Sequence, residues 1–448
     1  MSHEVTSAER ASVSTFDPSH GAILRIALPM TLGHITVPLM GLADTAVIGR
    51  LGEAQLLGGV VVATTIFDVL LWAFGFLRIG TVALTAQALG AGDRDEMRAT
   101  LARALVIAAA LGLTIIALQG PIAAFAFAAM GASEQVTQAG RAYFDMRIWS
   151  APFVFANYAL FGAIVGRART DVALALQVAV NLANIGLNIT LVYGAGLGVR
   201  GSGLGTLMAE ILQTCLCLLM VRHLGGPIFA LPWRRIASRA AMWRLVGINR
   251  DIMIRTLGLL FCYSFFSSQG ARGGDVMLAA NATLLNLSMF MAFFLDGYGT
   301  AAEQMCGRAF GARDEAVFRK TVRRVIGWGL GTSALLAIIA LIVGAGFVDF
   351  VTTNAAVREA AHAMLPFAAL TPIAGTLAFS FDGVFSGATW TREMRNLMLV
   401  VVALYLAVFW MTRPLGNMGL WIALLTFLGS RGLLQLWRYP RLVARAFA

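Results

Sequence analysis

The sequence predicts an all-α polytopic membrane protein, with twelve transmembrane helices in two pseudo-symmetric six-helix lobes. The chain of 448 residues is 58% hydrophobic and only 13% charged, whereas about 25% of the residues of a soluble domain are charged. Its apolar runs reach the roughly 20 residues that a helix needs to cross a bilayer. The runs are continuous and do not alternate in polarity, as the strands of an outer-membrane barrel would.

Twelve such runs follow one another along the chain, and the loops between them are short except for the connection over 222–246. The fourth run is composite, because residues 121–130 continue through 140–165 after a polar interruption. The predicted spans are 23–49, 56–89, 99–119, 121–165, 171–194, 201–221, 247–268, 276–306, 322–346, 355–388, 395–412 and 418–437.

The basic residues are distributed unevenly between the two sides of the membrane. The formal net charge is +11, and 25 of the 34 Lys and Arg residues fall in the termini and the even-numbered loops, against 7 in the other loops. Cytoplasmic loops carry such an excess, so we expect both termini in the cytoplasm and the chain in the inner (plasma) membrane. Because membrane topology accounts for the charge, we expect no nucleic-acid partner.

An internal repeat divides the chain into two halves. Residues 86–93 and 307–314 have similar sequences at an offset of 221 residues, and the same offset pairs 162–166 with 383–387. Each half holds an even number of spans, so the repeats run parallel. The predicted organisation is a polar cytoplasmic N-terminus over 1–22, an N-lobe over 23–221, a cytoplasmic linker over 222–246, a C-lobe over 247–437 and a cytoplasmic C-terminus over 438–448.

The first span carries a single carboxylate, Asp44, and a proline, Pro38, near its middle. An ionisable group inside a span is costly and usually functional, which makes Asp44 a candidate coupling residue. It lies only six residues before Arg50, so a position at the membrane interface is the second interpretation. Pro38 removes a backbone donor and collides with the carbonyl four residues earlier, which predicts a hinge in this helix.

Amide side chains line one face of the fifth span. Gln177, Asn181, Asn184 and Asn188 recur at intervals of four, three and four residues, which places them on one side of a helix. Amides are costly to bury against lipid. They serve either as hydrogen-bond contacts between helices or as the lining of a cavity that binds substrate or cation.

Further charged residues lie at membrane depth. Asp296 and Asp382 are candidates for a substrate cavity, with a structural or rim position as the alternative, and Arg78 is expected to pair with an acid of a neighbouring span. Asp251 and Arg255 are four residues apart, which predicts an i,i+4 ion pair. By position alone, six acids stand against two bases in mid-helix: Asp44, Asp68, Glu210, Asp296, Glu303 and Asp382 against Arg78 and Arg255.

The sequence has no motif of an enzyme or of a pump driven by ATP. There is no His-Glu-x-x-His zinc motif, no phosphate-binding loop and no Gly-x-Ser-x-Gly elbow. The four cysteines lie in apolar runs without paired spacing, which argues against disulfides and structural zinc. We therefore expect no catalytic activity, no metal site and no cofactor, and we expect an ion gradient to drive the protein.

A set of short motifs extends over nearly the whole chain, from about residue 23 to 437. The motifs are Pro29, Asp44–Gly49, Phe76–Thr81, Leu84–Ala91, Asn249–Met253, Leu278–Asn281, Leu295–Gly297, Phe381–Gly383 and Gly387–Ala388. In this order they resemble the DinF branch of the MATE (multidrug and toxic compound extrusion) transporters.

This resemblance implies an antiporter that exports organic, often cationic, small molecules from a cavity between two lobes, in exchange for protons or sodium ions. Asp44 matches the acid of the first helix at which the family couples ion and substrate, and Asn184 matches a polar residue beside it. Asn188 stands where many members have Asp, and the seventh span lacks a Glu found in some sodium-coupled relatives. Both departures favour protons.

The predicted sites follow from the residue patterns and the resemblance together. We expect a monomer in the lipid bilayer whose proton or cation site is formed by Asp44, Asn181, Asn184 and Asn188. The predicted substrate cavity contains Gln177, Arg78, Asp296, Asp382 and Asn281.

Two other classes of function are open to a protein of this architecture. A flippase for a lipid-linked or amphipathic anionic molecule would share the duplicated fold, but we expect such a protein to line its cavity with several Arg. Here acids outnumber bases in mid-helix, which favours cations. A membrane enzyme or passive channel would need a catalytic constellation or a repeated filter sequence, and the chain has neither.

Overall fold

The computed structural model describes residues 16–226 and 233–448, apart from the side chains at 37–39, 42, 72, 233 and 234. These residues form helices joined by short turns, and no strand occurs among them. Ten helical segments in this part of the chain are long and apolar enough to cross a membrane. Together with α2 (His20–Gly49) and α12 (Arg239–Arg272), which have 30 and 34 residues, they account for the twelve predicted spans.

The helices group into two compact units. Unit 1 contains the residues up to Thr31, the segment Ala86–Gly92 and Arg250–Ala448, and unit 2 contains Leu32–Thr85 and Asp93–Asn249. The division therefore passes through α2, and a short segment of the first half groups with the second half. The predicted lobes, which follow the chain from 23 to 221 and from 247 to 437, stay a prediction.

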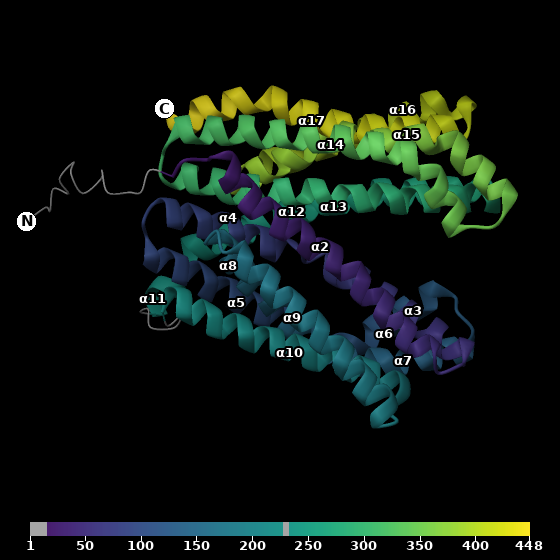
Figure 1. Ribbon diagram of the computed structural model, residues 1–448. Helices are drawn as coiled ribbons and strands as arrows, with labels where there is room; N and C mark the ends of the chain where they lie inside the picture. The colour runs from purple at the N-terminus through teal and green to yellow at the C-terminus, as the bar shows by residue number, and fades with distance from the viewer. Residues whose placement is uncertain (1–15, 227–232) are drawn as a thin grey trace, which may run out of the picture. The chain divides into compact units, whose positions relative to one another are not determined.

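Unit 2 is a helical bundle that includes the second part of α2. Its further elements are α3 (Ala54–Trp72), most of α4 (Phe76–Gly90), α5 (Arg94–Ala117), α6 (Gln119–Met130), α7 (Glu134–Arg147), the 3-10 turn η1 (Ile148–Ser150), α8 (Ala151–Gly166), α9 (Thr170–Ile189), the π-helical turn η2 (Thr190–Gly194), α10 (Gly198–Gly225) and α11 (Trp233–Ile236). Within it α5 packs on α8, while α8 and α9 both pack on α10 (Figure 1).

The structure corrects the predicted boundary between the third and fourth spans. The prediction ended one span at residue 119 and began the next at Pro121. In the structure α6 follows α5 directly, with Leu118 capping both, and Pro121 lies in the first turn of α6. A proline is tolerated there because the first-turn N–H groups have no partner within the helix. The chain reverses only at Gly131, which has a left-handed φ of 60°, and Ser133 then caps α7.

Unit 1 contains long helices, several of which lie side by side in green to yellow in Figure 1. Besides most of α12, they are α13 (Asp275–Gly311), α14 (Glu315–Val351), α15 (Ala355–Gly387), α16 (Thr391–Thr412), the 3-10 turn η4 (Arg413–Leu415) and α17 (Asn417–Phe447). Helix α15 packs on α13, α14 and α17. The core of unit 1 consists of aromatic and aliphatic side chains around the fully buried Trp421 and Phe266, whose rings meet edge to face.

Glycines show that the internal repeat extends to helix packing. In unit 2, Gly162 of α8 lies so close to the carbonyl of Arg78 on α4 that a Cβ would not fit. In unit 1, Gly383 of α15 lies in the same way against the carbonyl of Gly299 on α13. Both members of the second pair are offset by 221 residues from the first pair. The repeat predicted from sequence is therefore present in the backbone contacts of each unit.

A reciprocal glycine contact lies within unit 1. Gly90 lies against the carbonyl of Arg308, and Gly311 lies against the carbonyl of Gln87. Gly311 and Arg308 are the repeat equivalents of Gly90 and Gln87, so each half makes the same contact with the other. Gln87 Nε2 also donates to the carbonyl of Gly387 at 2.7 Å, which fixes this end of α4 on unit 1.

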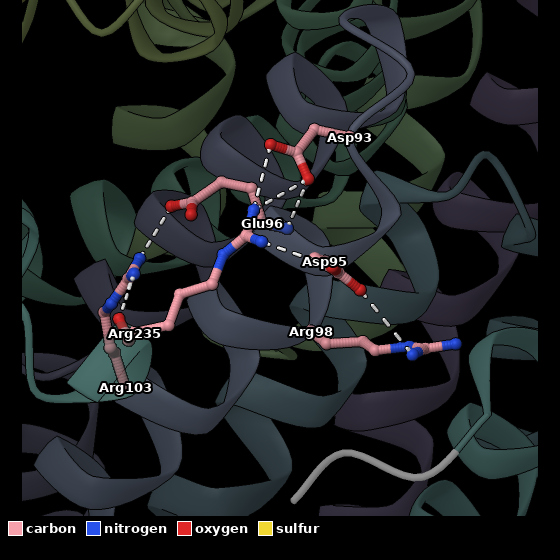
Figure 2. Close-up of polar contacts among 6 residues, drawn as sticks. All are labelled: Asp93, Asp95, Glu96, Arg98, Arg103 and Arg235. Atoms are coloured by element: carbon pink, nitrogen blue, oxygen red, sulfur yellow. Dashed lines mark hydrogen bonds and ion pairs between the residues drawn. The ribbon is translucent and has the colours of Figure 1, made fainter. Parts of the chain in front are cut away.

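Ionic contacts hold the short helix α11 on the start of α5 (Figure 2). The Arg235 guanidinium pairs with Asp93 at 3.1 Å and with Asp95 at 3.2 Å. Arg103, which is only 4% exposed, donates to the carbonyl of Arg235 at 2.8 Å and pairs with Glu96 at 2.6 Å. All of these residues belong to unit 2, so the part of the predicted linker that carries α11 is attached to the unit that precedes it.

Candidate functional site

Polar side chains inside unit 2 gather where α9 faces the second part of α2. On α9, Asn181, Asn184 and Asn188 are buried, and Asn188 is completely inaccessible. Gln177 Nε2 donates to Asn181 Oδ1 at 2.9 Å, and Asn188 Nδ2 donates to Asn184 Oδ1 at 3.2 Å. The four amides therefore form two hydrogen-bonded pairs along one face of the helix.

The same amides bond to α2. Asn181 Nδ2 donates to the Thr36 hydroxyl at 3.0 Å, and Asn188 Nδ2 donates to Asp44 Oδ1 at 2.5 Å. Asp44 itself is half-buried. The structure thus brings together the residues that the sequence assigned to a proton or cation site: Asp44, Asn181, Asn184 and Asn188.

One hydrogen-bond acceptor of Asn188 has no donor. Its Oδ1 is buried and has no hydrogen-bond partner among the described residues. A protonated carboxyl can donate to such an oxygen, and a small hard cation can take it as a ligand. The site therefore offers oxygen atoms of the right chemistry for a proton or a sodium ion, although no group of three or more His, Cys, Asp or Glu side chains suited to a metal occurs in the described chain.

Arg147 is a second polar feature of unit 2, and in the sequence it is one of the seven basic residues counted outside the cytoplasmic loops and the spans. It lies on α7, donates to the Tyr143 hydroxyl at 3.1 Å and covers the Phe67 ring at 4.7 Å from the centroid. Three acids lie within its electrostatic range: Asp44, Asp68 and Glu210. Arg147 thus stands among three acids in the interior of unit 2, which also contains Arg78.

Glu210 is part of a hydrogen-bonded group that joins α8 to α10. Asn157 Nδ2 donates to Glu210 Oε2 at 2.7 Å, and the Thr214 hydroxyl donates to Asn157 Oδ1 at 2.8 Å. These bonds indicate that Glu210 holds two helices together rather than contacting a transported molecule.

In unit 1 a second cluster surrounds Asp382 of α15. Arg431 Nη2 of α17 donates to Asp382 Oδ2 at 2.9 Å, and Gln435 Nε2 donates to Asp382 Oδ1 at 2.8 Å. Arg255 of α12 forms an ion pair with the same carboxylate. The i,i+4 pair expected between Asp251 and Arg255 is therefore wrong, because Asp251 pairs instead with Arg395 of α16 at 2.7 Å.

The remaining predicted residues occupy different surroundings. Asp296 is half-buried on α13, within electrostatic range of Arg255. Asn281 is only 1% exposed and accepts from Trp421 Nε1 at 2.9 Å, so its bonds join α13 to α17. Arg78 makes no ion pair with any acid that the structure describes, contrary to expectation. Pro38 lies outside the described side chains, and the backbone of α2 is helical across it.

Sequence reasoning missed Arg431 and Arg147 as interior bases. Arg431 is only 2% exposed, yet it was counted with the cytoplasmic positive charge because it lies near the predicted end of the last span. A signal was available, since Phe427, Leu428, Leu433 and Leu434 flank it on both sides. With these two residues, four bases instead of two stand against the six acids in mid-helix.

Comparisons with known proteins agree with the resemblance. The MatE family model matches residues 29–190 and 252–411. The DNA damage-inducible protein F of Escherichia coli (strain K12) is 37% identical over 94% of this chain and 92% of its own length. A probable multidrug resistance protein NorM of Bradyrhizobium diazoefficiens is 28% identical, over 89% and 88%.

A solved structure of MATE in the bent conformation superposes with a TM-score of 0.88 at 17% identity, covering 98% of both chains. At this low identity the likeness shows the fold alone. It agrees with the twelve helical spans predicted from the sequence.

Proposed function

Because the chain belongs to the MATE family of transporters, we propose that it is a secondary active antiporter that exports organic cations or cationic amphipaths in exchange for protons. The observation that carries the proposal is the hydrogen bond from Asn188 to Asp44 inside unit 2. We place the chain in the inner membrane as a monomer with both termini in the cytoplasm, driven by the ion gradient without a cofactor.

Competition at one carboxylate provides the coupling. The ionised Asp44 attracts the positive charge of a substrate, and the protonated Asp44 does not. Two ligands that favour opposite states of one group each weaken the binding of the other to the same extent. A proton that enters from outside therefore promotes release of the cationic substrate. Loss of that proton to the cytoplasm prepares the site to bind the next cationic substrate.

The amides of α9 make the two states of Asp44 structurally different. The bond from Asn188 Nδ2 to the carboxylate satisfies the ionised form. When Asp44 is protonated it becomes a donor, and Asn188 Oδ1, which has no hydrogen-bond partner among the described residues, can accept from it once the amide turns over. Protonation thus requires a rearrangement between α2 and α9 rather than a change of charge only.

Helix α2 is placed to transmit that rearrangement. Its residues up to Thr31 belong to unit 1 and those from Leu32 belong to unit 2. A shift of α2 against α9 therefore acts on the part of the helix that unit 1 holds. We propose that this link, with the hinge predicted at Pro38, drives alternating access.

Transport by everted vesicles tests the role of Asp44. Asp44→Asn keeps the size of the side chain and its bond to Asn188 but removes the titration, so it should abolish efflux of a fluorescent organic cation driven by a proton gradient. Asp145→Asn is the matched control, because Asp145 is an exposed carboxyl of the same unit. Efflux at the wild-type rate in the Asp44 variant would contradict the proposal.

The coupling ion and the class of cargo need separate arms of the same assay. Efflux is measured under a proton gradient alone and a sodium gradient alone, and we expect only the first to support transport. Reconstituted protein is also tested for transfer of fluorescent anionic lipids between leaflets. Lipid transfer without cation efflux would favour the flippase, to which Arg255 and Arg431 would contribute the positive charge.

A further inference from the structure

Two arginines of unit 2 meet where α10 ends. Arg98 of α5 donates from Nε to the carbonyl of Gly225, the last residue of α10, at 2.7 Å. Arg167, which directly follows α8, donates from Nη1 to the carbonyl of Ala163 at 2.9 Å. We call Arg98 and Arg167, together with the backbone of Gly225 and Gly226, the arginine-pair site. All of these residues belong to unit 2.

The two glycines allow the guanidinium groups to come together. A Cβ on Gly225 would lie 3.1 Å from Arg167 Nη2, and a Cβ on Gly226 would lie 2.9 Å from Arg98 Nη2. Gly226 has a left-handed φ of 77°, which favours glycine, but Gly225 lies within α10 and its backbone has no such requirement. The missing side chain at Gly225 therefore gives room to Arg167 rather than serving the turn.

The positive charge of the arginine-pair site is only partly balanced. Arg167 lies between the fourth and fifth spans and makes no ion pair with any acid that the structure describes. Arg98 is 3.7 Å from Asp95, but Asp95 also pairs with Arg235 at 3.2 Å. Figure 2 shows the Arg98 side chain extending away from Arg235, on the far side of Asp95. Burial and the positive charge of Arg98 both lower the pKa of Arg167, and an anion between the two guanidinium groups would offset this repulsion.

Most N–H groups of the two arginines are open to a ligand. A guanidinium has five of them, and each arginine uses a single nitrogen to donate to a described residue. The Arg98 side chain is 27% exposed and Arg167 is half-buried, so the other donors can be reached from outside. The carbonyl ends of α8 and α10 attract basic side chains, which accounts for one bond of each arginine but not for the meeting of two like charges. The sequence of residues 227–232 adds no Asp or Glu.

The internal repeat shows that the turn after α8 does not need an arginine. Ala168 in this turn has a left-handed φ of 61°, and its repeat equivalent Thr389 has a φ of 56°. Equivalent backbone hydrogen bonds close both turns. The residue of the second turn that corresponds to Arg167 is Ala388. The same local backbone therefore forms with alanine, and the arginine of unit 2 serves another purpose.

We propose that the arginine-pair site binds a phosphate group. The oxygens of one phosphate can accept from two guanidinium forks at once, and its negative charge balances the charge that the described acids leave over. The phosphate can belong to the head group of an anionic phospholipid or be free in solution. By the predicted topology this end of unit 2 faces the cytoplasmic surface of the membrane, where both sources occur. The inference goes beyond the proposed function and does not rest on it, since it uses none of the residues assigned to coupling.

Binding to the purified full-length protein in a neutral detergent tests the site without any transport. Isothermal titration calorimetry is performed with dihexanoylphosphatidylglycerol, with dihexanoylglycerol, which has the same chains and no phosphate, and with inorganic phosphate, all at one ionic strength set with chloride. Arg167→Ala removes one fork, and Ala388 shows that such a turn forms with alanine. Arg169→Ala is the matched control, because Arg169 is exposed, pairs with Asp171 and carries the same charge two residues further on.

We expect the wild type to bind dihexanoylphosphatidylglycerol, inorganic phosphate or both, and not to bind dihexanoylglycerol. Arg167→Ala should weaken that binding about tenfold, which corresponds to the loss of one hydrogen bond between charged groups. Arg169→Ala should leave it unchanged. Binding of the phospholipid alone identifies a lipid head group as the ligand, binding of inorganic phosphate alone identifies a soluble ligand, and binding of both identifies a site for phosphate in general.

A second variant keeps the test decisive if Arg167→Ala does not fold, which its melting temperature without ligand will show. Arg98→Lys retains the positive charge but removes the other fork, so it should weaken the same binding. The proposal is overturned if the wild type binds neither phosphate compound, or if a folded variant of either arginine binds as the wild type does. It is also overturned if Arg167→Ala and Arg169→Ala weaken binding equally, because a basic surface would then attract anions without a defined site. None of these results bears on proton-driven efflux, which is measured separately.

Discussion

Asn188 of α9 and Asp44 of α2 are joined by a hydrogen bond of 2.5 Å, and Asn188 also donates to Asn184 through the same nitrogen. One amide thus connects the single acid of the first span to the polar face of the fifth. Because Asn188 is fully buried, its amide depends on partners within the protein. The contact joins the coupling chemistry to the packing of two helices.

Removing the Asn188 amide should weaken both the coupling of transport to protons and the packing of α9 on α2. Asn188→Ala deletes the donor to Asp44 and leaves a carboxylate with one bond fewer, which costs about 1–3 kcal/mol when the group is buried. We expect a lower melting temperature of the purified protein and slower proton-driven efflux. Leu182→Ala serves as the control, because Leu182 is an exposed residue of the same helix. The prediction is wrong if Asn188→Ala melts and transports as the control does.

The glycine contacts of the repeat predict a difference between two Gly-to-Ala changes in unit 1. Gly383→Ala introduces a Cβ where the carbonyl of Gly299 leaves no space, so α13 and α15 must separate and overpacking should cost about 1–3 kcal/mol. Gly327→Ala on α14 meets open space. Thermal unfolding followed by size-exclusion chromatography should show a loss for the first variant only. Equal behaviour of the two would mean that the close approach is not required.

Because α11 is held on α5, we expect trypsin to cut slowly after Arg235 in the linker. Arg103→Met removes the donor to the carbonyl of Arg235 and the ion pair with Glu96, so trypsin should cut at Arg235 faster than in the wild type. Arg141→Met changes an exposed arginine of α7 in the same unit and serves as the control. Raising the salt concentration should speed cleavage of the wild type, since the exposed pairs of Arg235 with Asp93 and Asp95 are screened.

We call the contact between Asp17, before α2, and Lys320 of α14 the N-terminal tether. It predicts that the mobility of the start of α2 depends on pH. Lys320 Nζ donates to Asp17 Oδ1 at 2.8 Å, and this bond with the nearby positive charge lowers the pKa of Asp17. A lowered pKa in the folded state means that the contact adds stability at neutral pH and loses it as the pH falls through that lowered value. A spin label at Ala22→Cys, in a chain without other cysteines, should gain mobility on acidification.

The variant Asp17→Asn separates this tether from general acid effects. It should show the mobile spectrum already at neutral pH and a much smaller change on acidification. A spectrum that follows pH equally in both proteins would show that another group releases the segment.

The sequence predicted features that depend on local periodicity. Intervals of three and four residues were sufficient to place Gln177, Asn181, Asn184 and Asn188 on one face, and the 221-residue offset anticipated the matching contacts of Gly162 and Gly383. Features that depend on the partner of a side chain were not predictable. Arg255 had an acid four residues away in Asp251, but tertiary packing gave it Asp382 and gave Asp251 to Arg395.

Boundary errors had a similar origin. The residues around Pro121 look like an interruption in sequence, yet the first turn of a helix accepts proline, so the reversal fell at Gly131. Arg431 was assigned to the cytoplasmic end because the last span was ended at residue 437, whereas α17 continues to Phe447. At 1.5 Å per residue this extension of ten residues is about 15 Å, enough to move an arginine from the interface into the interior.

The reciprocal contact of Gly90 and Gly311 has a consequence for how this contact can change. Each glycine meets the carbonyl at the position equivalent to that met by the other, so the two contacts use the same pair of repeat positions. In a dimer of two identical halves one substitution would alter both contacts together. In this single chain Gly90 and Gly311 can change one at a time.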